Sequence, residues 1–453
     1  MKEVENLNNL LCNLEKNPLF QMSLGSKELF HSNLLAWIIS QKSQTKFVHK
    51  FLEEILKLEN KIVKIIQYPE REKKNIDLRF ILEIEDEKQS QLWIILENKV
   101  KSLPYKEQLV DYEEKTKEEL KKELKKENCA FKYYLVSLIN PAGGILPDNW
   151  KLIRYKNIAE KLRNSINEIN PNSDEILPFK SIIESYIDFI EDLHHLSELI
   201  EIKDSGENEL FDYTNRGKNK NDRAKFEKIR LHDLYLKIKH QQISDLIKRS
   251  IRDIENEAGI KVCDPRQNIK VKDKNPPDIS NGIYVNGDFS KNNGMVDFKY
   301  IPFTFEINNA KVYCVFCIQL QGGQLRYALE FVGKLSLETK LANKLLYTAG
   351  FKMLKDKTWI SFSADFLKEK KLDRNLYFSN SELQGKAREK KENDPDKIFP
   401  SFGLFIYKYD AVKRETTVEQ IVNLYVMIFE YLISKKGYFE DLIKESKKEL
   451  GIK

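Results

Sequence analysis

The sequence of 453 residues is poor in cysteine and contains no long apolar run. Its cysteines are Cys12, Cys129, Cys263, Cys314 and Cys317. An odd, scattered set of this kind argues against a disulfide framework and for a reducing compartment, so we expect a cytoplasmic protein. The longest apolar stretches, such as Val312–Leu320, have strand length and do not approach a membrane span. The first residues lack the basic start and apolar segment of a signal peptide, so we expect neither export nor a membrane partner.

A large excess of one charge sign is also missing. Lys and Arg number 76 against 70 Asp and Glu, a formal charge of +6 that suits a polyanionic partner only where basic residues cluster. Cations outnumber anions in Arg216–Arg230 and Lys386–Lys391. These stretches are candidates for nucleic-acid backbone contacts, and solvated surface lysines are the alternative. With 41% hydrophobic residues and 32% charged residues the chain is expected to fold, in more than one domain.

The N-terminal part has the pattern of an α/β domain. Residues 1 to about 60 show apolar spacing typical of helices. Short apolar segments between charged turns then predict successive strands over Lys61–Tyr68, Asn75–Glu85 and Gln91–Val100. The expected elements that follow are a helix after Pro104, a strand over Phe131–Ile139 that ends in a turn at 140–144, and helices over Ile158–Ile169 and Phe179–Leu199. We predict that this domain spans residues 1–205.

A polar segment that we interpret as a linker, residues 206–222, precedes a C-terminal α+β domain over 223–453. Its expected elements are an amphipathic helix over Ala224–Ala258, a strand-like and loop-rich region over Ile260–Gln321, and a final helix over Val418–Ser434. We see no internal repeat. The role of this domain is open between sensing, targeting and assembly.

Acidic and basic side chains lie at the start of one predicted strand and at the end of the next. Alternate residues of a strand share a face, so Glu97 and Lys99 project together while Asn98 points away. Asp77 opens the preceding strand, and antiparallel pairing would place it beside Glu97. Two carboxylates this close repel each other unless a cation lies between them, and oxygen ligands favour Mg²⁺ or Mn²⁺. The pattern therefore predicts a metal site with a lysine at its edge, which is suited to phosphodiester hydrolysis.

In these residues the chain resembles the PD-(D/E)XK nuclease superfamily, with Asp77 as the aspartate and Glu97-Asn98-Lys99 as the E-x-K triplet. Asn75-Ile76 stand where that family often has proline. The resemblance covers roughly residues 20–200 and implies a restriction-endonuclease-like core, a mixed sheet flanked by helices. It also implies a metal-dependent nuclease acting on nucleic acid, with DNA as the expected substrate. Members from bacteria often act in phage defence or restriction, which implies such a role and a defence-system partner. Paired active sites would alternatively suit double-strand cleavage by a homodimer.

The resemblance extends to two helices. Gln108 and Tyr112 match a polar motif on the helix after the E-x-K strand, where they would position the scissile phosphate. Ser23–Ile39 resembles the first-helix motif of a bacterial branch, in which a glutamate completes the metal site. Here that residue would be Glu28, and His31, one helical turn later, would be an accessory residue.

Each of these residues also has a structural interpretation. Glu97 and Lys99 could form a surface ion pair at a strand end, and Asp77 could simply open its strand. Glu28 suits the first turn of a helix through its charge alone. His31 could be a packing histidine. The pair Gln108 and Tyr112 could stabilise one face of a helix. Cys314 and Cys317 are best interpreted as small buried residues, since a zinc site needs four ligands.

We therefore consider three hypotheses. The first is a Mg²⁺- or Mn²⁺-dependent nuclease joined to a C-terminal domain. The second keeps the fold without the chemistry, as a nucleic-acid-binding or regulatory module. The third makes the chain an interaction protein whose C-terminal half is the working part. Metal binding that is lost on Glu97→Ala would favour the first, and salt-dependent affinity without a metal requirement would favour the second.

Overall fold

The structure is a computed structural model of the whole chain. The described residues are 2–23, 28–73, 76–86, 90–100, 106–123, 129–139, 146–170, 176–200, 224, 226–252, 254, 259–262, 282–290, 293–321, 323–333, 339–356, 358–359, 373–379, 404–413 and 415–452. Residues 140–144, where we expect a turn, and most of the two basic stretches lie outside them. Across the described part of the chain, no helix is long and apolar enough to cross a membrane.

The chain divides into two compact units. The first comprises Met1–Glu201 and Ala224–Ile238, and the second comprises Ile202–Arg223 and Lys239–Lys453. The segment 224–238 falls in the first unit because its apolar side chains join the core of that unit, Phe226, Ile229 and Leu231 among them. The predicted limit at residue 223 places this segment with the C-terminal domain instead.

The first unit has the predicted order of helices, three strands, a helix and a strand, with a further strand before the last helices. Its elements are α1 (Lys2–Lys16), α2 (Pro18–Met22), α3 (Glu28–Ile39), the 3-10 helix η1 (Lys42–Gln44), α4 (Thr45–Leu56), β1 (Ile62–Lys73), β2 (Ile76–Ile84), β3 (Gln91–Lys99), α5 (Lys106–Glu123), β4 (Cys129–Ser137), β5 (Trp150–Arg154), α6 (Tyr155–Ser165), the 3-10 helix η2 (Ile166–Glu168) and α7 (Ile176–Ile200).

Strands β1 to β5 form one mixed sheet in the order β1-β2-β3-β4-β5. The pairs β1–β2 and β2–β3 are antiparallel, whereas β3–β4 and β4–β5 are parallel. Leu78 lies opposite Leu96 in the β2–β3 pair, and this register brings Asp77 next to Glu97. The site residues therefore meet where β2 begins and β3 ends, and the pairing that the sequence predicts for these strands is present.

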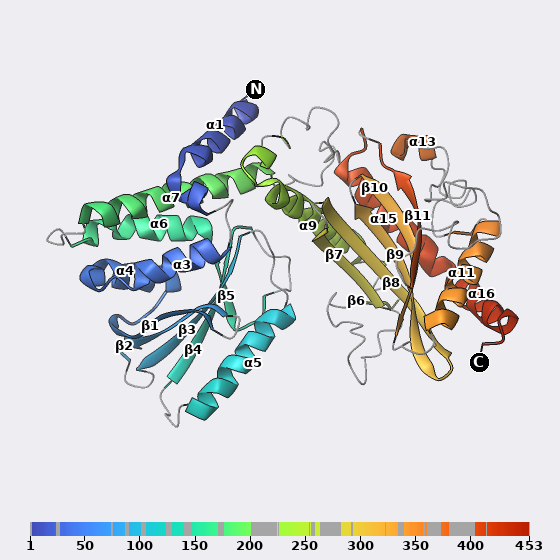
Figure 1. Ribbon diagram of the computed structural model, residues 1–453, viewed down its shortest axis with the longest axis horizontal. Coiled ribbons are helices and arrows are strands. Elements are labelled where there is room, and N and C mark those ends of the chain that lie inside the picture. Colours follow the sequence, from blue (N-terminus) through green and yellow to red (C-terminus); the bar gives the residue numbers. More distant parts are fainter. Residues whose placement is uncertain are drawn as a thin grey trace. The chain divides into compact units, whose positions relative to one another are not determined.

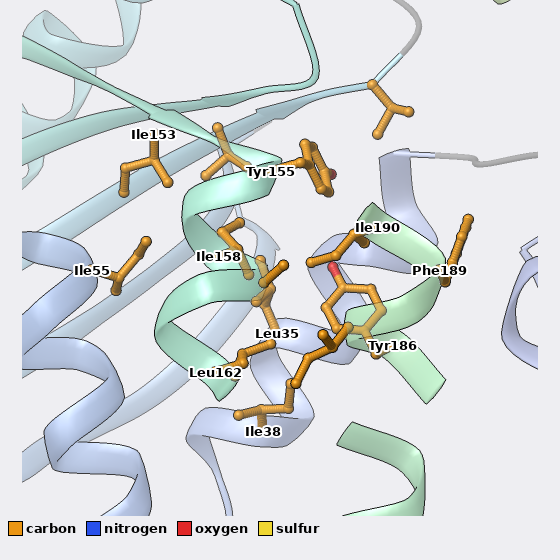
Figure 2. Close-up of a cluster of buried hydrophobic side chains, with 14 of the residues drawn as sticks. Leu35, Ile38, Ile55, Ile153, Tyr155, Ile158, Leu162, Tyr186, Phe189 and Ile190 are labelled. Carbon is orange, nitrogen blue, oxygen red and sulfur yellow. The ribbon is translucent and has the colours of Figure 1, made fainter. Parts of the chain in front are cut away.

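Helices cover both faces of this sheet, which explains why β2 and β3 are buried along most of their length. Helix α5 packs on one face through Leu109 and Tyr112, against Ile95 and Tyr133. Helices α3, α4, α6 and α7 lie on the other face (Figure 1). Figure 2 shows their side chains converging in one core. The labelled members are Leu35, Ile38, Ile55, Ile153, Tyr155, Ile158, Leu162, Tyr186, Phe189 and Ile190.

The second unit is an α+β arrangement around a larger sheet. Its elements are α9 (His232–Ser250, which begins in the first unit), β6 (Lys261–Val262), β7 (Gly282–Ser290), β8 (Asn293–Ile307), β9 (Ala310–Gln321), β10 (Gln324–Gly333), α11 (Thr339–Lys355), α13 (Arg374–Tyr377), β11 (Phe405–Ala411), α15 (Val418–Ser434) and α16 (Lys436–Glu449). The sheet has the order β11-β10-β9-β8-β7-β6 and is antiparallel apart from the β6–β7 pair.

Aromatic contacts hold the last helices against one face of this sheet. The ring of Phe298 on β8 packs on Phe429 of α15, and Phe316 on β9 packs on Phe439 of α16. Cys314 and Cys317 are fully buried on β9, which agrees with their interpretation as small core residues. The Sγ atom of Cys317 lies 2.9 Å from Oδ1 of Asp297, on the sheet face opposite to that of Phe316.

The predicted fold class, α/β followed by α+β, is confirmed. In the second half, one predicted helix is wrong in extent, and another has the predicted bounds but is not the last helix. The helix expected over Ala224–Ala258 is interrupted before α9, because Arg230 adopts a positive φ of 61° that an α-helix does not accommodate. The helix over Val418–Ser434 is present but is not the last, because α16 follows directly. Its apolar positions Phe439, Leu442 and Ile443 are buried.

Candidate active site

Glu97 and Lys99 form a close ion pair at the end of β3. The Nζ atom of Lys99 lies 2.6 Å from Oε1 of Glu97, with 11% and 2% of the two side chains exposed. The two residues alternate along the strand and so share the face that α5 covers. A pair this deeply buried is not the solvent-exposed ion pair considered above as the structural alternative. Such an exposed pair would contribute little to the stability of the fold.

Asp77 occupies the neighbouring position on β2. Its Oδ2 atom accepts a hydrogen bond of 2.7 Å from the backbone N–H of Asn98. This bond fixes the carboxylate against the middle of the Glu97–Lys99 triplet, so Asp77 has a defined place beside the ion pair. It does more than open a strand.

Glu28 reaches the same place from the first turn of α3. Its Oε1 atom accepts a hydrogen bond of 3.2 Å from the backbone N–H of Val100, and its Oε2 atom lies 3.9 Å from Nζ of Lys99. The glutamate is therefore directed at the strand end, where the first-helix motif predicts it. The structure thus places three carboxylates around one lysine.

Gln108 and Tyr112 approach from α5, one helical turn apart. The Nε2 atom of Gln108 donates to the hydroxyl of Tyr112 over 2.7 Å and to Oε1 of Glu97 over 3.4 Å. Tyr112 is buried in the cluster between α5 and the sheet. The two polar groups border the carboxylates, which is a suitable place from which to contact a phosphate.

Burial and neighbouring charges shift the pKa values of the side chains in this cluster. Burial raises the pKa of Glu97 to about 7, with smaller contributions of the same sign from Asp77 and Glu28 and an opposing one from Lys99. Burial also raises the pKa of Asp77, against the hydrogen bond from Asn98. For Lys99, burial lowers the pKa but the nearby carboxylates outweigh it, so the net shift is upward. One lysine does not neutralise three acids, so the cluster favours a further cation.

The donor atoms fit a divalent metal ion. The two oxygens of Glu97 differ, because Oε1 contacts Lys99 and Gln108 whereas Oε2 is buried and has no hydrogen-bond partner among the described residues. A buried acceptor without a partner is costly, and a hard cation would satisfy it. Among the described residues, no group of three or more Asp, Glu, His or Cys side chains is placed so that it could hold a metal ion. Mg²⁺ commonly takes one or two carboxylates and completes its shell with water and phosphate oxygens.

His31 lies behind this cluster, in the helical core. It is fully buried, and its Nδ1 atom is 3.1 Å from the hydroxyl of Tyr186. Its ring packs against Tyr155 and Phe189, with centroid distances of 5.0 and 5.2 Å. Burial lowers the pKa of His31 to about 3, so the ring is neutral. The structure therefore places His31 with the aromatic core and not with the carboxylates.

Asn98 is the site residue that sequence reasoning missed. Its side chain points away from Glu97 and Lys99, as strand alternation requires, but it is 3% exposed and fully engaged. It hydrogen-bonds to the backbone of Glu28, to Ser32 and to Tyr155. A polar residue in the buried register of an apolar strand is the signal that could have identified it.

The first unit is thus an α/β domain whose central strand ends in a Glu-x-Lys triplet beside an aspartate. The family model of the PD-(D/E)XK nuclease superfamily matches residues 16–184, so this part of the chain is similar to that superfamily. No curated protein and no solved structure matched the chain. The predicted resemblance is thereby confirmed for the first unit, within the range of α2 to α7.

Proposed function

We propose that the protein is a metal-dependent nuclease that hydrolyses phosphodiester bonds of DNA, with its active site at the meeting point of β2, β3, α3 and α5. The observation that carries the proposal is the buried Glu97 carboxylate, paired with Lys99 through one oxygen and without a partner at the other. Superfamily membership supports a nuclease, and divalent metal ions are general among these enzymes.

The carboxylates of Glu28, Asp77 and Glu97 would hold Mg²⁺ or Mn²⁺. When bound, such an ion polarises a phosphodiester and lowers the pKa of a coordinated water. Asp77 is held for this role by the N–H of Asn98, and Glu28 by the N–H of Val100. Glu97 keeps Oε2 without a hydrogen bond.

The remaining residues would act on the water and on the substrate. Lys99 carries its proton on Nζ, since its pKa is raised, and donates from there to orient the attacking water. The Gln108 amide and the Tyr112 hydroxyl, joined by a 2.7 Å hydrogen bond, would hold the scissile phosphate in line. Tyr112 packs in the buried cluster between α5 and the sheet, which holds its ring in place.

The cellular role that we propose is antiviral defence in the cytoplasm, and it rests on the resemblance to bacterial members. A nuclease needs targeting, and we assign sensing, targeting or assembly to the C-terminal domain predicted over 223–453. Cutting both strands of a duplex would suit a homodimer with paired sites, and a defence-system partner is the alternative.

Cleavage assays test this function. The full-length protein is incubated with supercoiled plasmid, linear duplex, single-stranded DNA and RNA, each with Mg²⁺, Mn²⁺ or EDTA. The expected result is cleavage of DNA with metal and none with EDTA. Cleavage of RNA alone would change the substrate class. Salt-dependent binding without any cleavage or metal binding would favour the nucleic-acid-binding module instead.

A further inference from the structure

One residue connects the three elements that carry the candidate metal-binding carboxylates, β2, β3 and α3. Asn98 lies between Glu97 and Lys99 in the chain, its backbone holds Asp77, and its side chain holds the first turn of α3, where Glu28 lies. We propose that Asn98 is a positioning residue that sets the metal-binding carboxylates of α3 and of the strands relative to one another. This inference rests on the proposed metal-dependent function.

The side chain of Asn98 ties β3 to α3. Its Nδ2 atom donates to the backbone oxygen of Glu28 over 3.0 Å and to Oγ of Ser32 over 3.1 Å. The hydroxyl of Ser32 in turn lies 3.2 Å from the same Glu28 oxygen. Asn98 therefore anchors the backbone of Glu28, while Val100 anchors its carboxylate. The glutamate is fixed at both ends.

Tyr155 fixes the orientation of the Asn98 amide. Its hydroxyl donates to Oδ1 of Asn98 over 2.6 Å, so the amide oxygen faces α6 and the amide nitrogen faces α3. Tyr155 is the first residue of α6, directly after β5, and it is fully buried. Figure 2 shows its side chain at the start of that helix. Its ring packs on His31, whose Nδ1 atom is in turn within hydrogen-bond distance of Tyr186 on α7. The amide is thereby held by the helical core.

Holding α3 in a fixed position against β3 is more important for a metal site than for packing alone. Ligands must be held within about 0.5 Å of their productive positions, and outer partners that hold them change metal affinity by about 10- to 100-fold when removed. Glu28 reaches the site from α3, so its distance from Asp77 and Glu97 depends on how that helix is held. Asn98 supplies a direct side-chain bond between the two elements.

The test separates positioning from stability with three variants. Tyr155→Phe removes one hydroxyl and keeps the ring, and Asn98→Ala removes all three side-chain hydrogen bonds. Tyr134→Phe is the matched control, because Tyr134 is equally buried but donates to the backbone oxygen of Leu56, at the end of α4. Mn²⁺ affinity is measured by calorimetry, and the Tm is measured without metal.

We expect Tyr155→Phe to weaken Mn²⁺ binding by about 10-fold and Asn98→Ala by up to about 100-fold. Tyr134→Phe should lower the Tm by a similar amount to Tyr155→Phe and leave the Mn²⁺ affinity unchanged. Unchanged affinity in Tyr155→Phe, with normal binding in the wild type, would overturn the positioning role and leave the proposed function intact. A wild-type protein that binds no Mn²⁺ would overturn the proposed function, and this inference with it.

Discussion

The Glu97 carboxylate is bound asymmetrically by Lys99. Nζ of Lys99 lies 2.6 Å from Oε1, whereas Oε2 of the same group is buried without a hydrogen-bond partner. An arrangement built only for stability would satisfy both oxygens, since a buried acceptor without a partner is costly. The asymmetry is instead suited to a carboxylate that offers its second oxygen to a ligand.

Glu97→Gln should abolish cleavage. The amide has the size of the carboxylate but carries no charge, so the variant should lose metal binding and reduce cleavage by about 100-fold or more. Plasmid cleavage under Mg²⁺ measures this, beside Mn²⁺ calorimetry. A variant that cuts as fast as the wild type would remove Glu97 from the mechanism.

The same variant offers a control for folding. Because the pKa of Glu97 is raised from 4.5 to about 7, the folded state binds its proton more tightly than the unfolded state. Without metal, ionisation of Glu97 therefore destabilises the folded state. This destabilisation grows as the pH rises from the pKa of Glu97 in the unfolded state to its pKa in the folded state. The Tm of Glu97→Gln should thus exceed that of the wild type above the folded pKa and match it below the unfolded one.

Metal binding should depend on pH through the same group. Glu97 must lose its proton before it binds a cation, and its pKa without metal is about 7. Mn²⁺ affinity should rise steeply from about pH 5.5 and level off by about pH 8.5. Calorimetry over this range measures the dependence. Affinity that is flat across it would show that Glu97 is not a ligand.

Lys99→Met should separate cleavage from metal binding. The methionine retains the apolar stem but removes the charge that lowers the pKa values of Glu97 and Asp77. We expect cleavage to fall by about 100-fold, while Mn²⁺ still binds at alkaline pH because the carboxylates remain. Single-turnover cleavage and calorimetry at two pH values measure the two effects. Rapid cleavage by this variant would exclude Lys99 as the group that orients the water.

Tyr112→Phe should weaken substrate binding. It removes the hydroxyl to which Gln108 donates, so the pair can no longer hold a phosphate as a unit. We expect KM to rise by about 10-fold with Mn²⁺ affinity unchanged. Tyr133→Phe is the matched control, because Tyr133 lies in the same buried cluster but its hydroxyl has no hydrogen-bond partner in the part of the chain that the structure describes. Equal KM values in the two variants would contradict a role for Tyr112.

Periodicity alone predicted the central geometry. Alternation along a strand placed Glu97 and Lys99 on one face, and antiparallel pairing of consecutive strands placed Asp77 beside them. Both inferences need only local pattern and chain order. The last helix of the fold and the strand β5 escaped prediction, because β5 spans only Trp150–Arg154 and carries little periodic signal.

The supporting contacts could not be predicted from the sequence. Asn98 bonds to Glu28 and to Tyr155, which lie 70 and 57 residues away in the chain. Such pairs depend on how α3 and α6 pack on the sheet, and no local pattern encodes that packing. The same holds for His31, because helical spacing places it near Glu28 but only the surrounding rings show that it faces the core.

The most direct test of the metal site is to locate the ion. Crystals of the full-length protein grown with Mn²⁺ would be measured by anomalous diffraction near the manganese absorption edge. The account predicts an anomalous peak bound by carboxylate oxygens of Asp77 and Glu97, and its loss in Glu97→Gln crystals. A wild-type map with no peak at these carboxylates, from protein that cleaves DNA under the same Mn²⁺ concentration, would contradict it.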